Sequence, residues 1–234
     1  MKKALFFVLG TAFILAPVAM LAQSKPTAAT YITDEEVKAV NALPGIDRTI
    51  KVVDIGPENF AVGVIHRAAP AAGRGAAAGA GAGAARGTGA GAGAGAAAGG
   101  GAGRGAAPAA EPCGEQITAP PTGGTPGMIA HDQQTEGYLI ISGSGTLVTG
   151  GKIVNGRKST PESEVTKVLN GPSCSGMAVG ADIVKKAVKT GDIIIIPAMV
   201  PHGWIDITDH VDYLSFRPSA RVLDAGYTNP ALKK

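Results

Sequence analysis

The stretch YLIISGSGTLVTGGKIV, residues 138–154, indicates the fold class of this chain. Its β-branched and aromatic residues fall in short runs at 138–142, 146–149 and 152–154, and glycines separate these runs. Short apolar runs between turn residues are typical of β-strands. The pair Gly150 and Gly151 suits a tight hairpin. We therefore predict three strands here, the last two joined by that hairpin.

The same rhythm continues on both sides of this stretch. Further strands are predicted at residues 49–53, 60–67, 193–196 and 211–216. The run of four isoleucines at 193–196 is expected of a strand that is covered on both faces. Residues 160–171 fit either a helical turn opened by Pro161 or a strand with a loop. Many short strands with Gly and Pro turns predict an all-β domain, a closed barrel or a two-sheet sandwich.

Two N-terminal segments precede these strands. The first 22 residues have the pattern of a secretory signal. Lys2 and Lys3 form its charged start, residues 4–21 are apolar, and cleavage is expected after Ala22. The alternative is an uncleaved membrane anchor. We expect a secreted or periplasmic protein with no stable membrane span after signal removal.

Residues 23–46 are expected to contain one short helix. Thr33 and Glu36 fit a capping box, and Val37 and Val40 are spaced for one helical face.

Residues 71–110 are almost entirely Gly and Ala. Such a tract cannot bury enough side chain to offset its ordering entropy. We predict a disordered, low-complexity surface loop inside one barrel domain, residues 47–222, followed by a tail at 223–234. The formal charge of +3 becomes −2 without five basic residues of the signal and the tract, Lys2, Lys3, Arg74, Arg86 and Arg104. This charge argues against nucleic-acid binding.

Cys113 and Cys174 are the two cysteines of the chain, and loop-forming residues flank both. In an oxidising compartment they are candidates for one disulfide. The alternative is two unrelated thiols, and the sequence leaves both open.

Two distant segments supply the makings of a metal site. His131 and Glu136 lie just before the strand at 138–142, and His202 follows Pro201 after the isoleucine run. His131 and Glu136 differ in strand parity, so a bulge or turn between them is needed for convergence. Two neutral imidazoles and one carboxylate leave coordination positions free, which suits Fe(II), Mn(II), Ni(II), Cu(II) or Zn(II). The alternatives are an ordinary polar hairpin and a turn histidine.

Both segments resemble the two motifs of the cupin superfamily, in the same order. Residues 131–143 are similar to the first motif, with Ile129 at the place of its first histidine. Residues 191–206 are similar to the second, with Met199 in place of its middle glycine and Asp206 in place of its asparagine. The resemblance implies a single double-stranded β-helix, a jelly-roll barrel, and dioxygenase, isomerase or related activities. It also makes a homodimer a reasonable expectation.

Several other residues are candidates for supporting roles. Gln133 could be an additional ligand or hold a water, although a solvent-facing glutamine is the plainer interpretation. Tyr138 and Trp204 would point inward with Glu136 and His202 and could wall a pocket or simply pack in the core. His66 is expected at the surface or beside the ligands, and His210 is expected to face outward.

Three functions fit these observations. The first is an exported metal-dependent enzyme acting on a small oxygenated substrate, with Glu136 as a possible acid or base. The second is a non-catalytic module that binds a carbohydrate or another small molecule. The third is a metal-free surface protein whose low-complexity loop mediates adhesion.

Overall fold

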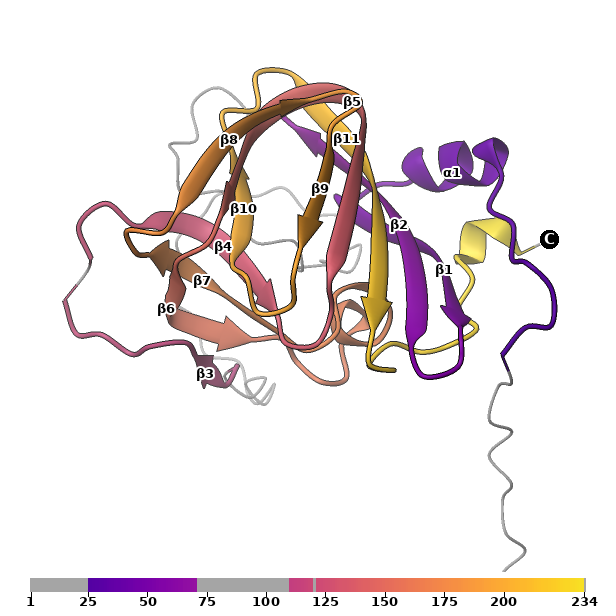
Figure 1. The fold of residues 1–234 in the computed structure, drawn as a ribbon, viewed down its shortest axis with the longest axis horizontal. Coiled ribbons are helices and arrows are strands. Elements are labelled where there is room, and N and C mark those ends of the chain that lie inside the picture. The colour runs from indigo at the N-terminus through magenta and orange to yellow at the C-terminus, as the bar shows by residue number, and fades with distance from the viewer. Residues whose placement is uncertain (1–24, 71–109, 120, 234) are drawn as a thin grey trace, which may run out of the picture.

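The computed structural model describes residues 25–70, 110–119 and 121–233. The predicted signal and residues 71–109 of the Gly/Ala tract lie outside the described residues. The described chain consists mainly of antiparallel strands with one α-helix, and the strands curve around a common interior (Figure 1). This architecture confirms the predicted all-β, jelly-roll-type fold.

The first sheet contains the two strands predicted before the tract. β1 (Asp47–Asp54) and β2 (Asn59–Ala68) form an antiparallel hairpin, and β2 pairs with β11 (His210–Ser219). β11 in turn pairs with the first part of β5 (Glu136–Thr149), whose other edge pairs with β9 (Ile193–Ile196). Strands from both ends of the chain thus lie side by side in this sheet.

The second sheet begins on the later part of β5. There β5 pairs with β8 (Val184–Lys189) and with β10 (His202–Ile205). The order continues from β10 through β4 (Thr125–His131) and β7 (Ser173–Val179) to β6 (Lys152–Lys158) and β3 (Pro112–Cys113). β5 therefore belongs to both sheets.

A sharp bend at Gly143 allows β5 to serve both sheets. Gly143 has a φ of +71°, and a Cβ at this position would lie 2.0 Å from the carbonyl oxygen of His210. Only glycine fits here without displacing backbone. The two strands predicted at 138–142 and 146–149 are consequently one bent strand.

The predicted hairpin at Gly150 and Gly151 is wrong. β6 does not pair with β5 but with β7 and β3, on the far side of β10 and β4. The Gly150 N–H donates to the carbonyl of Pro201, 2.9 Å away. The two glycines carry the chain out of one pairing into another, because long-range pairing outweighs the local hairpin preference.

The expectation that residues 193–196 are covered on both faces is also wrong. Ile193 and Ile195 are each 73% exposed, whereas Ile196 is 2% exposed and faces the core. β9 pairs on one edge with β5, so it is a one-sided strand at the edge of the first sheet.

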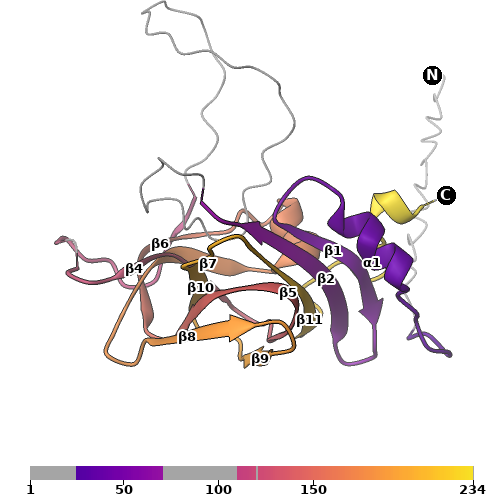
Figure 2. The same cartoon turned by 90° about the horizontal axis from the view of Figure 1, so that it is seen from above.

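The helix α1 (Asp34–Asn41) lies against the outside of β1 and β2 (Figure 2). Its predicted capping box is confirmed, because Thr33 and Glu36 each accept a hydrogen bond from the other's backbone N–H. Val40 is fully buried against Ile50 and Val64. Within the part of the chain that the structure describes, none of the helices has the length and apolarity needed to cross a bilayer.

Three further segments complete the domain. Residues 160–171 contain a single helical turn, η1 (Val165–Leu169), which agrees with the helical alternative. The C-terminal segment ends in η2 (Pro230–Leu232) and runs along β1, where the Asn229 side chain donates to the Thr49 carbonyl at 2.9 Å. Cys113 and Cys174 form a disulfide that joins β3 to β7, which agrees with the bridged alternative.

Candidate metal centre

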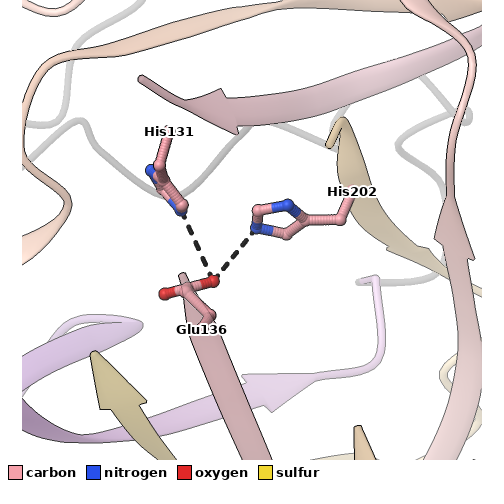
Figure 3. A group of neighbouring side chains, drawn as sticks. All are labelled: His131, Glu136 and His202. Carbon is pink, nitrogen blue, oxygen red and sulfur yellow. Dashed lines mark ion pairs between the residues drawn. The ribbon is translucent and has the colours of Figure 1, made fainter. Parts of the chain in front are cut away.

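The three predicted ligands come together inside the barrel, each at the end of a strand (Figure 3). His131 is the last residue of β4, Glu136 is the first of β5, and His202 is the first of β10. Glu136 Oε2 lies 3.4 Å from His131 Nε2 and 3.1 Å from His202 Nε2. All three side chains are buried, with exposures of 5% or less. They form a group able to hold a metal ion.

A turn brings His131 and Glu136 together, as their different parity required. Residues 132–135 carry the chain from β4 in the second sheet to β5 in the first, and the Thr135 N–H donates to the Pro218 carbonyl at 3.2 Å. Gln133 is exposed on this turn, which agrees with its solvent-facing interpretation. Gln134 is buried instead and donates to the Leu169 carbonyl at 3.3 Å. Neither glutamine is among the groups that meet at Glu136 Oε2.

A tight turn before β10 delivers His202. The Val200 N–H donates to the Pro197 carbonyl at 3.2 Å, and Met199 adopts a φ of +69° in this turn. This left-handed conformation favours glycine, the residue that the cupin motif has at this place. The Met199 N–H donates to the His131 carbonyl at 2.7 Å, so the turn is tied to β4. The chain thus adopts a left-handed turn with a methionine at this position.

The hydrogen-bond partners of both imidazoles assign their tautomers. His202 Nδ1 lies 3.0 Å from the Val200 carbonyl, which can only accept, so His202 Nδ1 carries a proton. Ser173 Oγ donates to the carbonyls of Asn170 or Gly171, and it therefore accepts from His131 Nδ1 at 2.9 Å. In the neutral imidazoles both Nε2 lone pairs then face Glu136.

The two oxygens of Glu136 have different partners. Oε1 accepts from Arg217 Nε at 2.9 Å and from Ser215 Oγ at 3.3 Å. Oε2 faces both imidazoles and accepts from the Tyr138 hydroxyl. Arg217 also forms a 2.6 Å ion pair with Asp47. The contacts at Oε1 orient the carboxylate and leave Oε2 as the atom available for an ion.

Burial and charge fix the protonation of this group. Burial lowers the pKa of the His131 imidazole, an effect that Glu136 offsets only in part. Burial alone would raise the pKa of the Glu136 carboxyl, but His131 and Arg217 outweigh it and hold that pKa well below its usual range. Burial, reinforced by the Glu136 charge, raises the pKa of the Tyr138 phenol well above its usual range. The site therefore contains an ionised carboxylate, a neutral His131 and a protonated tyrosine.

The geometry fits a divalent ion. Nitrogen and oxygen ligands bind such ions at about 2.1 Å, so neighbouring ligand atoms lie roughly 3.0–3.5 Å apart. The two distances from Glu136 Oε2 to the Nε2 atoms, 3.4 Å and 3.1 Å, fall in this interval. The lone pairs of the neutral His131 imidazole and of the Glu136 carboxylate repel one another unless a cation lies between them. The donor set of nitrogen and oxygen suits Fe(II), Mn(II), Ni(II), Cu(II) or Zn(II).

Of the other predicted side chains, Tyr138 and Trp204 lie beside this centre, whereas His66 and His210 lie away from it. Tyr138 is buried, its ring lies 4.4 Å from that of Tyr213, and the Trp204 ring lies 5.3 Å from Tyr213. Both belong to the apolar interior next to the ligands. His66 is 43% exposed, and its Nδ1 lies 2.6 Å from Asp212, away from the ligands. His210 Nε2 lies 3.0 Å from Ser142 Oγ at the bend of β5.

Sequence reasoning missed Ser173, Ser215 and Arg217. Ser173 follows a proline loop, and nothing in its local pattern marks it. Ser215 and Arg217 share the inward parity of Val211 and Tyr213. An arginine in inward register directly after the predicted strand 211–216 was therefore the available signal.

No protein-family model matches this chain, and no curated protein matches it. Two of the solved structures that match this chain are remote in sequence and in structure. Peruvianin-I, a cysteine peptidase from Thevetia peruviana latex, is 10% identical with a TM-score of 0.30, over 82% of this chain and 77% of that one. A recombinant oxalate oxidase in complex with glycolate is 10% identical with a TM-score of 0.31, over 86% of this chain and 60% of that one. At these values neither bears on activity, and the fold assignment rests on the strand pairing of this chain.

Proposed function

We propose that this protein is an exported cupin-type barrel that binds a divalent transition metal through His131, Glu136 and His202 and acts on a small oxygenated organic substrate. The observation that carries the proposal is the convergence of two Nε2 atoms on one carboxylate oxygen, with each Nδ1 held by an outer partner. Metal-binding histidines are commonly held in this way.

Each residue of the site has a definite role in the proposal. A metal ion bound there would polarise a substrate oxygen as a Lewis acid and, in the case of Fe(II), support O₂ chemistry. His131 and His202 supply Nε2 as ligand atoms, and Glu136 supplies Oε2 while Arg217 holds Oε1. The Tyr138 hydroxyl keeps its proton on the metal-facing side of Glu136, where it can donate to a bound oxygen atom.

Export is a separate part of the proposal. The N-terminal signal pattern is the sequence argument for it, and the Cys113–Cys174 bridge supports it because disulfides persist in oxidising compartments. N-terminal sequencing of the protein from culture supernatant or periplasm tests it. A chain that starts after Ala22 supports export, and a cytosolic chain with an intact N-terminus contradicts it.

Metal content is the primary test of the site. We expect about one transition-metal ion per chain from elemental analysis of protein from its native compartment. His202→Ala and Glu136→Gln should lose the metal and retain the β-sheet circular dichroism signal. Gln is used because it leaves a hydrogen-bond acceptor for Arg217. His210→Ala is the matched control, and it should keep the metal.

Activity is tested after metal reconstitution. Aerobic and anaerobic assays with small hydroxy acids, keto acids and diols should show metal-dependent turnover in the wild type and none in Glu136→Gln. Saturable binding with no product would contradict the catalytic part and leave a binding module. A wild-type protein that takes up no transition metal would overturn the site assignment.

A further inference from the structure

Arg67 lies on the inner face of the barrel, at the end of β2. It is paired directly with Val211 of β11, so the two residues share one face of the sheet. The next inward pair is Ile65 and Tyr213, and these two residues belong with Val211 to the apolar cluster of the interior. An arginine therefore projects into the same interior as the candidate metal ligands.

Arg67 is incompletely paired, unlike Arg217. Its Nε donates to the Tyr213 hydroxyl at 3.0 Å. Across residues 25–70, 110–119 and 121–233, no carboxylate lies within ion-pair distance of Arg67, and its two amino groups have no hydrogen-bond acceptor. Arg217 by contrast is matched by Glu136 and Asp47. A guanidinium of intermediate exposure without a counterion has two donor groups available for a ligand.

Trp204 supplies a second donor without an acceptor. Its Nε1–H is buried and has no hydrogen-bond partner in the described structure. The Trp204 ring packs 5.3 Å from the ring of Tyr213, the same residue that Arg67 contacts. A buried N–H without a partner is costly. Two side chains in contact with Tyr213 thus present N–H groups that lack acceptors, and an anion would satisfy them.

This donor pair is connected to the candidate metal centre through two tyrosine rings in tilted contact. The Tyr213 ring lies 4.4 Å from the Tyr138 ring, and the Tyr138 hydroxyl donates to Glu136 Oε2. The inward-facing residues of β11 differ in polarity along the strand. Val211 and Tyr213 lie beside Arg67 at one end, and the polar Ser215 and Arg217 lie beside Glu136 at the other. Both ends of this face, the Arg67 end and the Glu136 end, therefore belong to one continuous inward side of β11.

We propose that Arg67, assisted by Trp204 Nε1, binds the carboxylate of a small organic acid whose other end points toward His131, Glu136 and His202. A planar guanidinium with two unpaired amino groups matches a carboxylate in bidentate geometry. The placement of the far end rests on the proposed function, whereas the carboxylate site stands on Arg67, Trp204 and Tyr213 alone. The substrate class of the centre is then an organic acid.

Binding of simple carboxylates to the metal-free full chain tests the site. Trp204 is the only tryptophan, so its fluorescence reports events beside Tyr213 directly. Butyrate, glutarate and benzoate should bind by calorimetry and, for the two aliphatic acids, change this fluorescence. Their neutral amides should bind at least about tenfold more weakly, because they lack the charge that pairs with Arg67. Equal binding of acids and amides, or no binding of any acid at millimolar concentrations, would overturn the proposal.

Variants assign the effect to Arg67. Arg67→Gln should weaken acid binding by at least about tenfold, and Arg67→Lys should restore part of it. Arg157→Gln, at an exposed position of β6, is the matched control and should bind as the wild type does. Tyr213→Phe removes only the hydroxyl that orients Arg67 and should give an intermediate loss if Arg67→Gln does not fold. Wild-type acid affinity in Arg67→Gln would overturn the assignment.

Metal analysis of the same samples separates this proposal from the previous one. Arg67→Gln should keep the metal content of the wild type. Arg67-dependent acid binding in a protein that takes up no metal would support the carboxylate site and contradict the metal centre. A metal-loaded protein whose acid affinity does not depend on Arg67 would support the metal centre and contradict the carboxylate site.

Discussion

Arg217 Nε donates to one oxygen of the Glu136 carboxylate, and both imidazoles of the candidate centre face the other oxygen. The arginine is 1% exposed and also pairs with Asp47. The buried positive charge of Arg217 thus holds the Glu136 carboxylate in place. Its removal would leave two buried carboxylates without their counterion.

Arg217→Met should therefore destabilise the fold strongly. We expect the free energy of unfolding to fall by about 3–5 kcal/mol, as for other buried ion pairs that lose one partner. Urea denaturation of the metal-free protein measures it. Arg157→Met, at an exposed position of β6, is the control, with an expected change within about 0.5 kcal/mol. A loss below 1 kcal/mol for Arg217→Met would mean that Glu136 is not held as described.

Ser173→Ala tests the orientation of His131. The serine accepts from His131 Nδ1 and so directs Nε2 toward Glu136. Loss of such an outer partner weakens metal binding by about 10–100-fold without removing a ligand. Competition with a chromophoric chelator measures the dissociation constant. Ser144→Ala, at an exposed position of β5, should leave it unchanged. Equal affinities for the two variants would remove Ser173 from the site.

Metal binding should weaken as the pH falls. Imidazole nitrogens bind metals only when they are deprotonated, so protons compete with the ion. Free imidazole titrates near pH 6.5, and burial lowers the pKa of His131. This ligand should therefore remain available to more acidic pH than an exposed imidazole, and most of the loss should occur below about pH 6.5. Chelator titrations from about pH 8 to about pH 5 measure the dissociation constant of the metal over this range. Affinity independent of pH would exclude imidazole ligation.

Met199→Gly should stabilise the turn that precedes His202. The left-handed backbone of Met199 costs a non-glycine residue about 1 kcal/mol, and its side chain is 65% exposed with little packing to lose. We expect the free energy of unfolding to rise by up to about 1 kcal/mol. Ala198→Gly in the same turn has no such strain to relieve and should lose about 0.5 kcal/mol. A destabilised Met199→Gly variant would show that the methionine contributes packing.

Reduction of the Cys113–Cys174 bridge should lower stability. The cysteines are separated by 61 positions, and cross-links that close loops of this size contribute about 2–4 kcal/mol. Thermal unfolding with and without a reductant measures the effect. A Cys113→Ser/Cys174→Ser variant should match the reduced protein and show no response to reductant. An unchanged transition in reduced wild type would show that β3 contributes little to the fold.

The sequence predicted that His131, Glu136 and His202 come together, from their residue types and their places beside predicted strands, and the topology placed them at three strand ends. It could not predict their support. Ser173 reaches His131 only because β7 pairs with β4, and Arg217 reaches Glu136 only because β11 pairs with β5. Such contacts depend on long-range pairing, which no local pattern encodes.

The two errors in the fold have the same origin. Gly150 and Gly151 have the composition of a hairpin, yet β5 uses its edges for β10 and β8, so β6 must pair elsewhere. The isoleucines of β9 have the composition of a central strand, yet Ile193 and Ile195 face outward from a sheet edge. Composition predicts that a strand forms, and competition among strands decides where it lies.

The bend at Gly143 has a thermodynamic consequence. Because β5 runs through both sheets, one sheet cannot melt and leave the other intact, and the barrel should unfold as one cooperative unit. An ion bound by Glu136, the first residue of β5, would then raise the melting temperature of the whole barrel and not of one half.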